Sequence, residues 1–348
     1  MLIASRMVVA QYLGYAPRSP GLIHSITGLT AGARMPRAEW DAIGRLVVPR
    51  PSLPEQAAIV RFLDWATQRV DRAIRAKRRL VALLTEQKQA IIHRAVTQGL
   101  DPSVPMKASG IPWLGEIPAH WEKVRNLALF AGRNESGSEG LPVLQVSLRN
   151  GVSISSLNIT RKQRLIKDKS LYKRAYPEDI AYNTMRLWQG AVGVVGQQGL
   201  VSPAYVVLQP RLATNSRFYS AVFGLRIYQQ LINRYSTGIV SDRNRMYWVT
   251  FKSLPNVAPA YAEQAAIVAH LDGATRDLDA TIERTQRQIG LLREYRARLV
   301  ADVVTGKLDV RAFAETLPDE APDDIEAIEA DVDEDADDDE TGDGADEG

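Results

Sequence analysis

An internal repeat constrains this chain more than any other feature of its sequence. The segment from Glu55 to Asp101 aligns without a gap on the segment from Glu263 to Asp309, at a constant offset of 208 residues. Both copies begin with EQAAIV, and about twenty of the 47 positions are identical. A duplication of this length indicates two equivalent structural units within one chain.

Each copy of the repeat carries apolar residues at alternating steps of four and three, the spacing of one helical stripe. A single stripe usually packs against its own domain, whereas two helices with the same stripe favour packing against each other. We therefore predict two long helices, each of about 33 residues, that act as spacers. Their predicted pairing residues are Val70, Ile74, Val81, Leu84, Ile91, Leu278, Ile282, Ile289, Leu292 and Leu299.

The segments around the repeats differ in texture. Between them, short apolar runs broken by Gly, Asn, Ser and Pro are typical of short strands and turns in a mixed α/β domain. The first fifty or so residues resemble the end of that domain, since Trp40 lies 208 residues before Trp248. The predicted order is a partial domain, a first spacer helix region, a complete domain, a second spacer helix region and a tail, at residues 1–54, 55–101, 102–259, 260–310 and 311–348.

The net charge of +2 hides a strong asymmetry. Residues 317–348 contain 17 Asp or Glu and no Lys or Arg, which leaves the remainder near +19. A basic body suits a polyanion, because Lys and Arg displace counterions from nucleic acid phosphates; a basic but merely solvated surface is the alternative. The acidic tail is predicted to be disordered, with a role in solubility favoured over competition with DNA.

Several function classes lack their motifs. Cysteine is absent and the four histidines are scattered, so disulfides, thiolate catalysis and zinc sites are excluded or implausible. The chain has no GxxxxGK[ST] loop for ATP and no NPPY motif of adenine methyltransferases, and its GxxGxxG at Gly190, Gly193 and Gly196 fits a hairpin better than a nucleotide loop. No apolar run reaches the length of a membrane span and no signal pattern begins the chain, which favours the cytoplasm.

Five stretches resemble the specificity (HsdS) subunits of type I restriction-modification enzymes. They are PRPSLPEQAAIV, SGIPWLGEIPAHWE, YNTMRLWQGAVGVV, GLVSPAYVVLQP and VVTGKLDV, beginning at Pro49, Ser109, Tyr182, Gly199 and Val303. Together with the repeats they cover the body almost to Leu317.

The resemblance implies an α/β fold class: a mixed α+β target-recognition domain, two long antiparallel coiled-coil helices and a disordered acidic C-terminal tail. It implies a non-catalytic subunit that binds double-stranded DNA and scaffolds methyltransferase (M) and restriction or translocase (R) subunits. S-adenosylmethionine, ATP and Mg²⁺ are expected on those partners and not on this chain. The family normally has two complete recognition domains, whereas here the first retains only its last part.

The predicted DNA-binding residues combine cations and amides that pair with phosphates and base edges. A Lys-rich run is expected mainly to touch phosphates, and a probable loop with the sequence SDRNRMYW is expected to carry readout residues. A solvated charged face is the alternative for the run. The residues are Lys162, Arg164, Lys167, Lys169, Lys173, Arg174, Asn183, Arg186, Gln189, Arg243, Asn244 and Arg245.

Two alternatives remain at this stage. The chain can be a truncated half-subunit that pairs with another S chain, or with a second copy of itself, to read a symmetric site. It can also be a coiled-coil adaptor whose basic surface binds a different acidic partner. An isolated nuclease or methyltransferase is the weakest hypothesis, because its motifs are missing.

Overall fold

The computed structural model describes residues 9–16, 20–28, 40–45, 47–111, 113–136, 140–148, 150–154, 171–236 and 244–318. The chain divides into two compact units, here called the terminal unit and the central unit. The terminal unit comprises residues 1–76 and 289–348, and the central unit comprises residues 77–288. Each long helix contributes one end to each unit. None of the helices in these ranges is long and apolar enough to cross a membrane.

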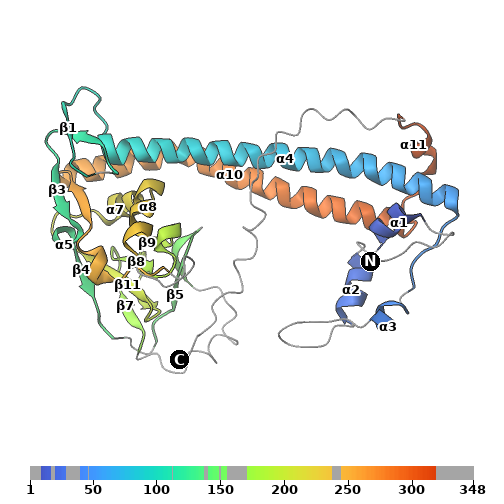
Figure 1. The fold of residues 1–348 in the computed structure, drawn as a ribbon, viewed down its shortest axis with the longest axis horizontal. Helices are drawn as coiled ribbons and strands as arrows, with labels where there is room; N and C mark the ends of the chain where they lie inside the picture. The colour runs from blue at the N-terminus through green and yellow to red at the C-terminus, as the bar shows by residue number, and fades with distance from the viewer. Residues whose placement is uncertain are drawn as a thin grey trace. The chain divides into compact units, whose positions relative to one another are not determined.

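Two long helices correspond to the repeat (Figure 1): α4 spans Leu53–Gln98 and α10 spans Tyr261–Val304, with 46 and 44 residues. Both exceed the predicted length of about 33 residues, because helix continues beyond the apolar stripe at each end. The amino end of α4 is fixed by Ser52, whose N–H and hydroxyl both donate to Glu55 Oε2, at 3.0 and 2.9 Å. The bond from the Ser52 N–H to the Glu55 carboxylate is one half of a capping box. The helix ends before Gly99, which has a φ of +73°.

The two helices run antiparallel where they meet in the central unit. Lys77 donates to Gln288 Oε1 at 2.7 Å, and Lys88 donates to Asp279 Oδ1 at 2.5 Å, so the position on α10 falls as the position on α4 rises. In the terminal unit, Arg296 forms an ion pair with Asp71 at 3.2 Å. The predicted antiparallel coiled-coil arrangement is confirmed in the fold.

The predicted pairing stripe is the less exposed face of both helices. Leu83 and Leu291, which lie off the stripe, are 55% and 65% exposed. On the stripe, three residues are buried and the others are half-buried. The buried residues are Val70, Ile74 and Ile289; the half-buried residues are Val81, Leu84, Ile91, Leu278, Ile282, Leu292 and Leu299.

The central unit contains a mixed α+β domain built on antiparallel strands, as the resemblance implies. Its largest sheet has the order β4-β11-β8-β9, and its other strands form four two-stranded sheets. The four strands of the sheet are β4 (Phe130–Arg133), β11 (Tyr205–Pro210), β8 (Ile180–Asn183) and β9 (Val192–Val194). The pairs are β1 (Met106–Ala108) with β2 (Glu116–Pro118), β3 (Glu122–Arg125) with β12 (Pro255–Ala258), β5 (Leu144–Ser147) with β6 (Gly151–Ile154), and β7 (Lys173–Ala175) with β10 (Gly199–Val201).

Helices complete this domain and cover its core. They are α5 (Asn126–Leu129), the 3-10 helix η3 (Leu187–Gln189), α7 (Ser216–Phe223), α8 (Arg226–Tyr235) and α9 (Trp248–Phe251). The core joins aromatic side chains of α7 and α8 to both long helices, through Val96 of α4 and Ile267 and Leu271 of α10. The domain is therefore anchored on the ends of α4 and α10 that lie in its own unit.

The terminal unit consists of helices in its described part. α1 (Ala10–Tyr15), α2 (Pro20–Gly28) and α3 (Trp40–Ile43) precede α4, and α11 (Arg311–Glu315) follows α10. A small core joins α1, the start of α4, the end of α10 and α11, with Ala314 of α11 buried in it. Packed structure thus continues to Leu317, past the predicted start of the tail at 311, because Val310 and Ala314 are buried in this core and the Phe313 ring contacts Phe62 of α4. Residues 319–348, which carry the predicted disorder, lie outside the described residues.

One set of hydrogen bonds recurs at the start of both long helices. In the central unit, the buried Gln264 accepts the N–H of Asn215 before α7 at 2.8 Å and donates to the Pro259 carbonyl at 2.8 Å. In the terminal unit, the buried Gln56 accepts the N–H of Val9 before α1 at 2.8 Å and donates to the Pro51 carbonyl at 2.9 Å. The repeat therefore duplicates one packing contact: a buried glutamine of each long helix binds the residue that precedes a short helix. The short helix is α7 in the central unit and α1 in the terminal unit.

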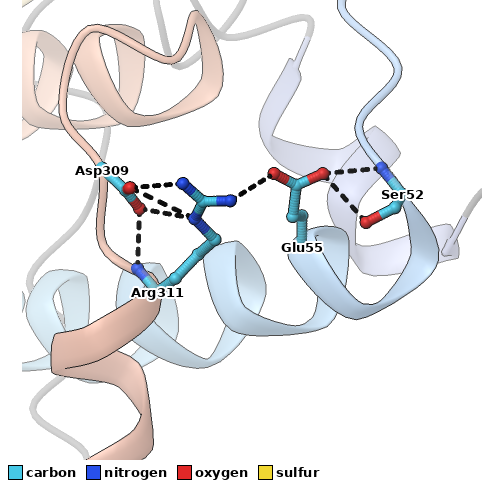
Figure 2. A network of polar contacts seen from close by, with 4 residues as sticks. All are labelled: Ser52, Glu55, Asp309 and Arg311. Carbon is cyan, nitrogen blue, oxygen red and sulfur yellow. Dashed lines mark hydrogen bonds and ion pairs between the residues drawn. The ribbon is translucent and has the colours of Figure 1, made fainter.

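The glutamate of each EQAAIV motif binds the segment that follows the other long helix. In the terminal unit, Arg311 bridges Glu55 and Asp309 (Figure 2), at 3.2 Å to Glu55 Oε1 and 2.6 Å to Asp309 Oδ2. The hydrogen bonds from Arg311 lower the pKa of Asp309 to about 2. In the central unit, Glu263 Oε1 accepts the indole N–H of Trp121 at 3.0 Å. Both contacts join one helix start to the chain that leaves the other helix.

Candidate nucleic-acid interface

Two of the predicted basic segments meet at one small hollow in the central unit. Lys173 comes from β7, and Arg245 comes from the segment before α9; both line a hollow of about 150 Å³. The end of β8 is tied to the second segment, because Met246 N–H donates to the Thr184 carbonyl at 2.9 Å. Hydrogen bonding between distant parts of the sequence thus places the two cations at one site.

Lys173 is held against the backbone of the domain. Its Nζ donates to the Tyr205 carbonyl at 2.7 Å, and partial burial lowers the pKa of its ammonium group. An ammonium group has three donors. A phosphate oxygen at the hollow would offset the desolvation of the charge and accept one of the others.

Arg245 is exposed, and its side chain lies against a tyrosine. Its guanidinium donates to Tyr247 Oη at 3.3 Å, and the Tyr247 side chain is 46% exposed. Asn244 is tied to α8, where its Nδ2 donates to Asn233 Oδ1 at 2.6 Å. A planar guanidinium at a hollow with an apolar wall of Met185 and Tyr247 has the donor geometry that reads guanine or holds a phosphate.

The remaining predicted residues do not all gather at this hollow. Asn183 is buried at the end of β8, where its Oδ1 accepts the N–H of Met185 at 3.0 Å, so it shapes the turn. Arg174 is half-buried, and its Nε is buried without a hydrogen-bond partner in the described part of the chain. Arg186 is half-buried and Gln189 is exposed, both beside η3. Lys162, Arg164, Lys167, Lys169 and Arg243 lie outside the described residues.

Arg133 of β4 forms an ion pair with the buried Asp179, and the half-exposed Glu135 adjoins this pair. Arg133 Nε donates to Asp179 Oδ2 at 2.8 Å, and Tyr176 Oη donates to Glu135 Oε2 at 2.8 Å. Burial raises the pKa of Asp179, while hydrogen bonds from Tyr176 and Arg133 favour its charged form. The chain turns at Glu178 and Asp179, since Asp179 N–H donates to the Tyr176 carbonyl at 3.0 Å.

Sequence reasoning missed the residues that complete the hollow. Thr184, Met185 and Tyr247 line it together with the two cations. Tyr247 lies inside the SDRNRMYW stretch that is predicted to carry readout residues, so the sequence does point to its neighbourhood. Thr184 and Met185 follow Asn183 directly, but their own side chains carry no charge that would mark them.

Comparison with solved structures finds chains that match most of this chain. A chain solved in a study of complex assembly and conformational transition of the type I R-M system matches with a TM-score of 0.56 and 18% identity, over 88% of this chain and 74% of that chain. The HsdS subunit from Thermoanaerobacter tengcongensis matches with a TM-score of 0.38 and 16% identity, over 86% and 70% of the two chains. The type I restriction-modification S subunit from M. genitalium matches with a TM-score of 0.41 and 12% identity, over 86% and 74%.

The TM-score of 0.56 carries the structural argument. The chain has an HsdS-like fold, with a mixed α+β domain and two long paired helices, as its sequence motifs predict. No protein-family model and no curated protein matches the sequence.

Proposed function

We propose that this chain is the DNA sequence-recognition subunit of a type I restriction-modification complex, and that its complete domain binds one half of a bipartite site. The observation that carries the proposal is the meeting of Lys173 and Arg245 at one hollow of a domain in a chain with an HsdS-like fold. The net charge near +19 outside the acidic tail supports a polyanionic ligand.

The remaining features of the complex follow from the same proposal. Methyltransferase subunits bind the long helices and translocating nuclease subunits join them, so S-adenosylmethionine, ATP and Mg²⁺ belong to the partners. The chain itself recognises DNA and does no chemistry. The cytoplasm is the compartment in which such a complex meets DNA.

The first test measures DNA binding by charge-removing variants. Arg245→Gln and Lys173→Met should weaken binding and lower the slope of log affinity against log salt by about one each where the lost contact is a phosphate. Arg284→Gln, an exposed position on α10, removes the same charge as a matched control and should change the slope little. Unchanged affinity of the double variant Arg243→Ala, Arg245→Ala at every salt concentration would favour the adaptor hypothesis instead.

The second test asks whether the domain carries sequence information. Residues 111–259 are exchanged for the corresponding domain of another specificity subunit, and the chain is expressed with its methyltransferase. The methylated half-site should change with the domain. An unchanged methylome contradicts the proposal.

The pairing of two copies on a symmetric site is the second candidate. One observation favours it: among the described residues, the strands all belong to the central unit, whereas the elements of the terminal unit are helices. Mass measurement of the purified chain with its methyltransferase, together with methylome sequencing, distinguishes a bipartite motif from a symmetric one.

A further inference from the structure

Three arginines line one face of α4 within the terminal unit. Arg69, Arg72 and Arg75, here called the arginine row, follow one another at steps of three, and all three residues are exposed. Residues three apart are neighbours on the surface of a helix. Val70 and Ile74, which are buried in the pairing stripe, lie on the opposite side of the helix. The arginine row is therefore on the solvent side of α4.

No carboxylate neutralises the arginine row within the described part of the chain. The two acidic residues of α4 nearest to it in sequence are engaged elsewhere: Asp64 accepts the hydroxyl of Tyr15 at 2.6 Å, and Asp71 pairs with Arg296 at 3.2 Å. None of the three arginines takes part in an ion pair among the described residues. Like charges at this helical spacing repel one another, so an anionic partner would stabilise the row.

The C-terminal segment leaves the described structure beside the arginine row. The guanidinium of Arg61 donates to the Leu317 carbonyl, and the Phe313 ring packs edge-on against Trp65 at a centroid distance of 5.4 Å. The Trp65 ring also carries the guanidinium of Arg69, 4.8 Å from its centroid. Arg61 lies about two helical turns before Arg69, which is about 12 Å along the axis. The chain beyond Leu317 therefore begins next to the row, in the same unit.

The segment that begins there has the charge and the length to cover the arginine row. Residues 319–348 contain 17 Asp or Glu and no Lys or Arg, and eight of the ten residues from 331 to 340 are acidic. The distance along α4 from Arg61 to Arg75 is about 21 Å, which about seven extended residues span. Carboxylates form charge-assisted, bidentate hydrogen bonds with guanidinium groups. A tether this short also holds the carboxylates at a high effective concentration near the row.

We propose that the acidic segment 319–348 binds the arginine row of α4 in the same chain, with its carboxylates paired to Arg69, Arg72 and Arg75. Each exposed pair contributes little alone, and the tether and the number of carboxylates supply the rest. The contact depends on charge, so its strength falls as salt rises. It occupies a cationic surface that nucleic acid phosphates would otherwise reach. It goes beyond the proposed function of the recognition domain and does not rest on it.

Carbodiimide cross-linking of the full chain tests this contact, because the reagent joins an amine only to a carboxylate that touches it. Arg72→Lys places an amine in the arginine row and keeps the charge. Arg298→Lys is the matched control, since Arg298 is an exposed arginine of α10 in the same unit and lies outside the row. Mass spectrometry of the digested monomer measures how much of each introduced lysine is joined to residues 319–348.

Arg72→Lys should give at least about fivefold more adduct with residues 319–348 than Arg298→Lys at about 0.05 M salt, because the tether favours the nearby row. Adding Arg69→Gln and Arg75→Gln to Arg72→Lys should lower the yield severalfold. Raising the salt to about 0.5 M should lower it as well, since the screening length falls below about 10 Å.

A second control separates the arginine row from the net charge of the chain. Arg94→Gln and Arg284→Gln, added to Arg72→Lys, remove two charges at exposed positions of the central unit and should leave the yield unchanged. Circular dichroism of every variant checks that the long helices are intact, so that a lost adduct reports on the contact and not on unfolding.

Equal yields from Arg72→Lys and Arg298→Lys, or a yield that survives loss of the two neighbouring arginines, would overturn the proposal. Adducts found between two chains, at the mass of a dimer, would assign the row to a second copy and contradict it as well. The intact chain with Arg69→Gln, Arg72→Gln and Arg75→Gln is also titrated with duplex DNA over a salt series. A salt slope lowered by about three, together with no adduct in Arg72→Lys, would assign the row to DNA instead.

Discussion

At the scale of single residues, the GxxGxxG stretch shows which glycines the fold requires. A Cβ on Gly193 of β9 would lie 2.7 Å from the Val152 nitrogen and 2.9 Å from the Gly151 Cα, and both are backbone atoms. We expect Gly193→Ala to lower the free energy of unfolding by about 1–3 kcal/mol, the usual cost of overpacking. Gly196→Ala is the matched control, since nothing lies within 4 Å of its Cβ. Urea unfolding followed by circular dichroism gives both values, and equal values would refute the close approach of β9 to β6.

Gln264 is a second residue whose environment predicts a measurable effect. It is 1% exposed, accepts one backbone N–H, and donates to the carbonyls of Ala213 and Pro259. Gln264→Leu leaves these groups buried without partners and should cost about 2–4 kcal/mol. Gln286→Leu, at an exposed position of the same helix, should change stability by less than about 0.5 kcal/mol. A small effect at Gln264 would contradict its role in seating α7 on α10.

The candidate site could be predicted from the sequence only in part. Lys173 and Arg245 were found because charge marks them, and the structure brings them to one hollow. Asn183 carries the same base-pairing chemistry, yet its Oδ1 accepts a neighbouring N–H and it is buried. Whether an amide faces DNA or its own backbone depends on tertiary packing, which residue type does not encode.

At the scale of elements, the long helices were predictable because a repeated apolar stripe at helical spacing leaves a local signal. The hydrogen bonds by which Gln56 and Gln264 hold the starts of α1 and α7 were not predictable. They join residues from 47 to 49 positions apart in the chain, and no periodicity marks such a contact. The repeat aligns the two glutamines with each other, and each of them accepts a backbone N–H at the start of a short helix, so the aligned residues make the same kind of contact.

The docking of α11 in the terminal unit should depend on acid pH. The pKa of Asp309 is lowered to about 2 by Arg311, below the 3.8 of the free side chain. The bond therefore contributes fully above about pH 4 and is lost as the pH falls through about 2. Hydrogen exchange of residues 311–317 is measured in the wild type and in Asp309→Asn at each pH. The ratio of the wild-type rate to the variant rate should rise as the pH falls through this window. The variant should show raised exchange already at neutral pH, and a wild-type profile parallel to the variant would contradict the linkage.

At the scale of the whole molecule, charge is divided sharply along the chain. Residues 319–348 carry 17 acidic side chains and no basic ones, so their removal changes the net charge from +2 to about +19. Deletion of this segment should raise affinity for random-sequence duplex DNA at low salt, because more positive charge attracts the phosphates. The difference should fall steeply as salt rises, since the screening length shortens from about 30 Å at 0.01 M to about 10 Å at 0.1 M.

Two controls separate charge from sequence in this segment. Shuffling the order of residues 319–348 retains the charge and should leave affinity as in the intact chain. Replacing its Asp and Glu by Asn and Gln should reproduce the deletion. Fluorescence anisotropy over a salt series measures all four proteins. If the shuffled segment behaves as the deletion does, its effect depends on a particular sequence and the electrostatic account is wrong; if all four bind alike, the acidic segment acts on solubility and not on DNA.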